Sequence, residues 1–213
     1  QNNVPIGVMV CFVDEVMWGG APSFTNIIEK LKGTFHIGTE NQQSFNYIGV
    51  HLTQNSDFSI TLDQNTYAQT INTIDITNDQ KGNPHQPLTK EETTQIRSAL
   101  GKNNWLAGMT RPEISFQVCQ ISTRVKNATI SDLISVNKSI KFVKNTPSFI
   151  KVPSLELKSI SITTYADASF NNLPDGGSQG GFIVFLIDKN NKSIPVSWNS
   201  TRLKRVARST LAA

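Results

Sequence analysis

Two apolar segments enclose a pair of acidic residues near the start of the chain. Residues 6–13 are rich in β-branched and aromatic side chains, which predicts a buried strand. Residues 16–18 predict a second strand, which ends at a glycine pair. The sequence therefore predicts a tight hairpin that carries Asp14 and Glu15 at its tip.

Adjacent carboxylates repel each other unless a cation lies between them, and hard divalent cations prefer oxygen ligands. Asp14 and Glu15 are therefore candidate catalytic residues and candidate metal ligands. The alternative is that they form an ordinary polar hairpin turn. The two residues alone leave both interpretations open.

The composition is that of a folded protein. The chain has 213 residues, 38% of them hydrophobic and 17% charged, which is enough for a sizeable core in one large or two small domains.

Cys11 and Cys119 lie far apart in apolar surroundings, so we expect reduced core thiols in an intracellular protein. No stretch approaches the roughly 18 apolar residues of a membrane helix, so no membrane contact is expected. The chain begins at Gln1 without a methionine, from which we expect a fragment or a processed product.

Hydrophobic periodicity divides the chain into strand-rich, helical and again strand-rich segments, expected over residues 1–76, 77–150 and 151–213. Thr89, followed closely by Glu92, predicts the start of the first long helix. The sequence further predicts helices over residues 24–32, from Pro112 and over residues 131–143, loops over residues 77–88 and between Pro147 and Pro153, and strands over residues 160–165, 181–187 and 194–198.

The last part of the chain is strongly basic. Residues 189–213 contain six Lys or Arg and no acidic residue, within a net charge of +4. Arg202, Arg205 and Arg208 recur at every third position, which predicts one face of a basic helix beginning at Thr201. Such a segment attracts a phosphate backbone through counterion release. A solvated helix face without a ligand is the alternative.

Two acidic motifs have counterparts in known enzymes. Phe12-Val13-Asp14-Glu15 is similar to the Tyr-x-Asp-Asp catalytic turn of reverse transcriptases, and Tyr165-Ala166-Asp167-Ala168 is similar to the first-strand motif of ribonuclease H. Together with the motifs between and after them, in this order, they resemble the Pol polyprotein of copia-type long-terminal-repeat retrotransposons over nearly the whole chain. The other motifs are Phe45-Asn46-Tyr47-Ile48-Gly49, Ile60-Thr61-Leu62-Asp63-Gln64, Thr110-Arg111-Pro112-Glu113-Ile114, Ser197-Trp198-Asn199-Ser200 and Arg208-Ser209-Thr210-Leu211-Ala212-Ala213.

The resemblance implies an α+β fold in three parts. These are a palm-type β-hairpin remnant in residues 1–76, a helical thumb or connection in residues 77–150, and the N-terminal strands of a ribonuclease H-like α/β domain in residues 151–213. It implies a fragment of an RNA-directed DNA polymerase with ribonuclease H that depends on Mg²⁺ or Mn²⁺. The implied partners are RNA, DNA or an RNA–DNA hybrid and the remainder of the Pol polyprotein. The implied location is intracellular, in a cytoplasmic particle or the nucleus.

The resemblance also assigns roles to residues. Asp14, Glu15 and Asp167 would be catalytic and would bind the metal ions. Phe12, which replaces the usual Tyr or His, would contact nucleic acid together with the primer-gripping hairpin and the basic segment. Plain strand packing is the alternative for the hairpin, and a cap on the following turn is the alternative for Asp167. The residues implied to contact nucleic acid are Phe12, Tyr47, Gly49, Arg202, Arg205 and Arg208.

Two departures put catalysis in doubt. Glu15 stands where the family has a second Asp, and a carboxylate displaced by about 1 Å can cost about a hundredfold in rate. The family's earlier palm acid and the glutamate after its Ser-Thr-x-x-Ala run are not among these 213 residues. We therefore expect both active sites to be incomplete and the chain alone to be inactive. The alternative is a non-catalytic nucleic-acid-binding remnant of a retroelement.

Overall fold

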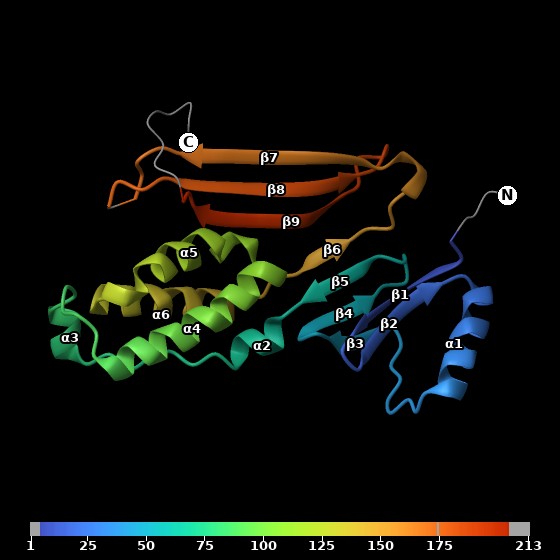
Figure 1. Cartoon of the computed structure of the whole chain (residues 1–213), viewed down its shortest axis with the longest axis horizontal. Coiled ribbons are helices and arrows are strands. Elements are labelled where there is room, and N and C mark those ends of the chain that lie inside the picture. The colour runs from blue at the N-terminus through green and yellow to red at the C-terminus, as the bar shows by residue number, and fades with distance from the viewer. Residues whose placement is uncertain (1–4, 174, 205–213) are drawn as a thin grey trace.

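The computed structural model describes residues 5–173 and 175–204. In these residues the fold is α+β, with three small antiparallel sheets arranged around a group of helices (Figure 1). One sheet pairs β1 (Gly7–Phe12) with β2 (Glu15–Gly20). A second has the order β3 (Ser44–Tyr47), β4 (Val50–Gln54), β5 (Ile60–Asp63) and β6 (Ile150–Val152). The third has the order β7 (Ser161–Ser169), β8 (Gln179–Ile187) and β9 (Ser193–Arg202).

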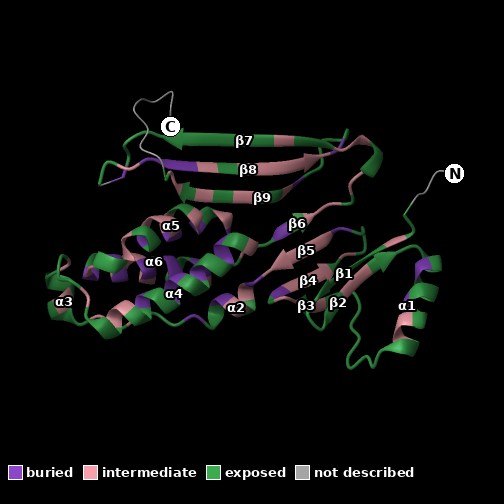
Figure 2. Ribbon diagram, viewed as in Figure 1, coloured by how far each residue is buried: buried purple, intermediate pink, exposed green. Residues whose placement is uncertain are grey.

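The main hydrophobic core lies among three helices, as the buried positions in Figure 2 show. These are α4 (Lys90–Met109), α5 (Ser115–Arg124) and α6 (Ile130–Asn145). Ile96, Leu106, Leu133 and Ile140 are fully buried between them. Three short helical elements contact this group: α2 (Asn65–Gln69), η1 (Pro112–Ile114) and η2 (Val125–Asn127). A fourth, η3 (Leu157–Ser159), precedes β7. No described helix is both long and apolar enough to cross a bilayer.

The helix starts predicted at Thr89 and Pro112 are confirmed, and the helix predicted over residues 24–32 is α1 (Pro22–Thr34). Thr89 accepts a hydrogen bond from the Glu92 backbone N–H, and the Glu92 carboxylate accepts one from the Thr89 N–H at 2.7 Å. Pro112 opens η1, with Arg111 in the cap position, and α5 follows directly. The third predicted helix corresponds to α6, which begins one residue earlier, at the cap formed by Thr129 and Asp132, and ends two residues later than expected.

Both predicted loops contain regular structure. The segment predicted as a loop over residues 77–88 contains α3 (Asn78–Gly82), which begins at a capping box between Thr77 and Gln80. The segment between Pro147 and Pro153 contains β6, which pairs with β5 over three residues. The paired residues of β5 lie 88 to 92 positions earlier in the sequence, so local sequence patterns carried no signal for this strand.

The first strand was predicted to be buried, and this was wrong. β1 is exposed over most of its length, with Val8 64% exposed, because α1 (Pro22–Thr34) covers only the outer end of the sheet. There, Phe24 packs so closely that a Cβ at Gly7 would lie 2.3 Å from its ring. Cys11 is exposed and Cys119 half-buried; both are free thiols, but neither is the core thiol that we expected.

The third sheet packs against the helices through β9, which lies over α5 in Figure 1. Trp198 donates a hydrogen bond from Nε1 to the Ala107 carbonyl at 2.7 Å, in the last turn of α4. That carbonyl has no partner within its own helix, because the last four carbonyls of a helix have none. The predicted basic helix from Thr201 is wrong at its start, because β9 continues to Arg202 in register with β8. Arg205 and Arg208 lie outside the described residues.

Two asparagines in the helical group give a direct test of this packing. Asn103 of α4 is fully buried, and neither atom of its amide has a hydrogen-bond partner among the described residues. We expect Asn103→Leu to raise the free energy of unfolding by about 1–3 kcal/mol, because it removes the desolvation cost of that amide. Urea denaturation at 25 °C measures the change.

Asn137 of α6 is the matched control. Its amide donates to the Ile74 carbonyl at 2.7 Å and accepts from the Ile74 N–H at 2.8 Å. The same substitution, Asn137→Leu, should lower the free energy of unfolding by about 1–2 kcal/mol, because both bonds are lost. A loss of stability in Asn103→Leu of the same size as in Asn137→Leu would contradict this account.

Candidate functional site

The two acidic residues lie at the tip of a hairpin with a two-residue turn, as predicted. Phe12 pairs with Glu15, so Val13 and Asp14 form the turn between β1 and β2. Asp14, Glu15 and Phe12 are all exposed. Val13 has a φ of 55° and is 84% exposed.

A positive φ at Val13 is strained, because the branched Cβ of an L-residue clashes with its own backbone there. A residue held in this region costs about 1–3 kcal/mol, and such residues cluster at active sites, ligand clamps and switch regions. The strained residue here directly precedes Asp14. Gly or Asn is the residue usually found at a turn position with positive φ, so Val13 is an unusual residue for this position.

Glu15 is bonded to a second hairpin. One of its carboxylate oxygens accepts a hydrogen bond from the Ile48 backbone N–H at 3.0 Å. Ile48 and Gly49 form the turn between β3 and β4, both with positive φ, as in the mirror-image turns that suit hairpins. The tip of the acidic hairpin thus contacts the turn of the hairpin predicted to grip a primer.

This contact continues inward through buried polar groups. The Gln64 amide donates to the Gly49 carbonyl at 3.3 Å and accepts from the Thr110 hydroxyl at 2.9 Å. Gln64 and Thr110 are both buried, and Thr110 directly follows the end of α4. Glu15 is therefore connected to the helical core through the Ile48–Gly49 turn, Gln64 and Thr110.

Sequence reasoning did not find the roles of Ile48, Gln64 and Thr110. Gln64 and Thr110 belong to motifs that were recognised, but neither motif indicates that the two side chains meet across 46 positions. The burial of Gln64 points to this contact, because a buried amide must find hydrogen-bond partners. Burial is known only from the structure, so the sequence did not indicate the contact.

The described residues do not fit a two-metal centre by themselves. Asp14 and Glu15 come from one hairpin, and one Glu15 oxygen is already bonded to Ile48. Within residues 5–173 and 175–204, no group of three or more His, Cys, Asp or Glu side chains is placed to hold a metal ion. A two-metal site needs carboxylates from more than one strand to hold both ions.

Asp167 lies in a different sheet from the acidic hairpin. It is exposed near the end of β7, opposite Gly181 of β8, and its carboxylate accepts a hydrogen bond from the adjacent Ala168 N–H at 2.9 Å. β7 is an edge strand among the three described strands of this sheet. Its assignment as a metal ligand stays a prediction.

The residues predicted to contact nucleic acid occupy varied surroundings. Tyr47 is half-buried, and its hydroxyl is enclosed without a hydrogen-bond partner in the described part of the chain. Arg202 was predicted to face a phosphate backbone, but its guanidinium donates to the Asp175 carboxylate. This contact, with a further hydrogen bond from the Gly177 N–H, holds the pKa of Asp175 below its usual value.

Comparison with known proteins shows which proteins this chain is similar to. No known family that was scanned matches the chain. The Retrovirus-related Pol polyprotein from transposon RE1 of Arabidopsis thaliana is 26% identical over 233 residues, covering all of this chain and 15% of that protein. The transposon Ty5-1 protein of Saccharomyces cerevisiae is 27% identical, covering 75% of this chain and 54% of its own length. The Retrovirus-related Pol polyprotein from transposon RE2 of Arabidopsis thaliana is 27% identical, covering 61% of this chain and 8% of its own length.

The chain is thus similar to Pol polyproteins of transposons along its whole length. Among these, its relatives are of the copia type, which confirms the resemblance drawn from the ordered motifs. The chain spans between 8% and 54% of the length of these relatives.

The bond between Glu15 and Ile48 can be tested by side-chain length. Glu15→Asp shortens the side chain by one methylene, so its carboxylate should no longer reach the Ile48 N–H. We expect amide hydrogen exchange at Ile48 to accelerate about fivefold, which corresponds to the roughly 1 kcal/mol of one hydrogen bond. Glu15→Gln keeps an acceptor at the same distance and should preserve most of the protection.

The Phe58 amide serves as the internal control, because it bonds to the Asn55 carbonyl at 2.9 Å in a separate turn. Its exchange should be equal in all three proteins. Equal exchange at Ile48 in the wild-type and Glu15→Asp proteins would show that Glu15 does not hold the second hairpin.

The contact between Arg202 and Asp175 should depend on pH. Because the pKa of Asp175 is lowered in the folded protein, the contact is present above the usual carboxyl range and is lost as the pH falls through the lowered pKa. Arg202→Gln should raise the pKa of Asp175 toward its ordinary value, as measured by NMR of the side-chain carboxyl. An unchanged pKa would mean that Arg202 is not bonded to Asp175 and remains available to a phosphate.

Proposed function

We propose that this chain is the junction between reverse transcriptase and ribonuclease H in a copia-type Pol polyprotein. In this proposal the β1–β2 and β3–β6 sheets belong to the palm, α4 to α6 form the connection, and β7 to β9 begin the ribonuclease H-like domain. The similarity to transposon Pol polyproteins supports the retroelement origin. The elements follow one another in the order of the predicted motifs.

One observation carries the proposal, the contact between Glu15 and Ile48. The acidic turn would act at the primer hydroxyl, and the β3–β4 hairpin would grip the same end of the primer. The two hairpins must therefore lie side by side. A direct hydrogen bond between their tips, 33 positions apart in sequence, supports the proposal because it holds the two hairpins side by side.

The chain by itself binds a template–primer hybrid without extending it. Two-metal phosphoryl transfer needs carboxylates that brace both ions, and among the described residues neither Asp14 nor Asp167 belongs to a group of three or more side chains placed to hold a metal ion. Further segments of the polyprotein would supply these groups. The acidic hairpin then acts as one half of a site.

A second candidate function is a non-catalytic nucleic-acid-binding remnant of a retroelement. The hydrogen bond between Glu15 and a backbone N–H favours it, because one oxygen of that carboxylate already has a structural partner. The two candidates differ when the preceding Pol segment of the same element is supplied in trans. Primer extension should appear if the chain is a polymerase segment and should not appear if it is a remnant.

Primer extension by the purified chain tests the proposal. With a DNA primer on an RNA template and either Mg²⁺ or Mn²⁺, we expect no extension and measurable binding of the hybrid. The binding should weaken steeply with salt, because it depends on phosphate charge. Asp14→Asn is the matched control and should leave binding unchanged. Extension by the wild-type chain, lost in Asp14→Asn, would contradict the proposed inactivity.

A further inference from the structure

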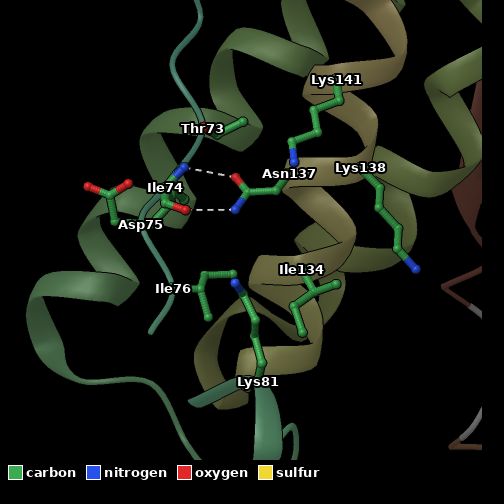
Figure 3. Close-up of a pocket in the computed structure, with 9 residues that line it drawn as sticks. All are labelled: Thr73, Ile74, Asp75, Ile76, Lys81, Ile134, Asn137, Lys138 and Lys141. Carbon is green, nitrogen blue, oxygen red and sulfur yellow. Dashed lines mark hydrogen bonds between the residues drawn. The ribbon is translucent and has the colours of Figure 1, made fainter. Parts of the chain in front are cut away.

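A pocket of about 340 Å³ lies away from both acidic motifs, between α6 and the extended segment that follows α2 (Figure 3). Residues 73–76 form one wall, and α6 forms the other. Lys81 of α3 closes one end. The pocket therefore joins three elements that are separate in sequence.

The floor of the pocket is apolar and anchored to the core. Ile74, Ile76 and Ile134 line it, and all three are half-buried and pack against the main hydrophobic cluster. Side chains held in this way move little, because they are packed against a close-packed interior. The floor thus offers a fixed apolar surface to an occupant.

The wall opposite α6 is also fixed, although it contains no helix or strand. The Asn137 amide makes both of its hydrogen bonds to the Ile74 backbone, at 2.7 and 2.8 Å, as a neighbouring strand would (Figure 3). This pair of bonds sets the distance between the extended segment and α6. The pocket is therefore formed before any ligand arrives.

The rim is positively charged. Lys81, Lys138 and Lys141 line the pocket with Asp75 as the one acid, and no carboxylate in the described part of the chain pairs with these lysines. Lys81 makes one long contact, 3.5 Å to the Asn78 side chain. In Figure 3 the amino groups of Lys81 and Lys141 are directed toward the pocket, whereas Lys138 and the Asp75 carboxylate extend away from it.

We propose that this pocket binds the phosphodiester backbone of a nucleic acid. Two ammonium groups on long side chains suit phosphates whose positions vary, and the isoleucine floor suits the apolar faces of sugars. The lining contains no aromatic ring for stacking and no arginine fork for a base edge, so binding should not depend on sequence. The inference rests on the proposed function and adds a second contact region, on the helical part of the chain.

A charge-matched pair of variants tests the proposal in the full chain. Lys81→Gln/Lys141→Gln removes two charges from the pocket, and Lys30→Gln/Lys102→Gln removes two from exposed positions on α1 and α4. Binding of a labelled RNA–DNA hybrid is measured by fluorescence anisotropy over a range of salt concentrations. We expect the pocket variant to lower the slope of log affinity against log salt by about 2, one for each lost phosphate contact, and the control to lower it far less.

The outcomes separate this site from the general function. If wild-type protein does not bind the hybrid, both the proposed function and the pocket assignment fail. If it binds and the two variants weaken binding equally, net charge accounts for the effect and the pocket assignment alone fails. Poly-L-glutamate serves as a second probe: if the pocket variant loses polyglutamate binding but keeps hybrid binding, the pocket is a site for acidic peptides and the assignment is overturned. Circular dichroism confirms that both variants are folded.

Discussion

The fold depends on the burial of apolar side chains between α4, α5 and α6. Removing a side chain such as Ile96 or Leu133 from water contributes about 1.5–3 kcal/mol, and this group contains the largest set of such residues in the described chain. The sheets are too small to form comparable cores of their own. A short segment, residues 146–149, leads from α6 to β6, which pairs with β5. β9 packs on α5, and Trp198 is hydrogen-bonded to the end of α4. The helical group is thus the support on which each candidate site is held.

Local signals in the sequence predicted most elements correctly. The capping pattern at Thr89 and the proline at position 112 set the helix starts, because caps and fixed φ values act within a few residues. Burial was harder to predict, because an apolar strand becomes buried only if another layer covers it. Nothing in residues 6–13 indicates that β1 is largely uncovered. β6 and the continuation of β9 to Arg202 depend on pairing with distant strands, which periodicity within a short window does not record.

The candidate site was predicted in its parts but not in its connections. The hairpin with Asp14 at its tip follows from two strand signals and a turn. The role of Glu15 does not, because its partner is a backbone N–H in another hairpin. The bond is possible because Ile48 lies in a turn with positive φ, where its N–H is not used by the β3–β4 ladder. Glu15 therefore has a structural partner in the second hairpin, which engages one of its two carboxylate oxygens.

The β1–β2 ribbon has a consequence for how this protein behaves in solution. Within the described chain each of its strands pairs only with the other, so both outer edges present unused backbone donors and acceptors next to exposed valine, methionine and phenylalanine side chains. Such an edge is a template for strand addition between molecules. Self-association of the isolated chain would begin there, while the helical core remained folded. Precipitation of this protein would then result from association of folded molecules through their β1 and β2 edges rather than from unfolding.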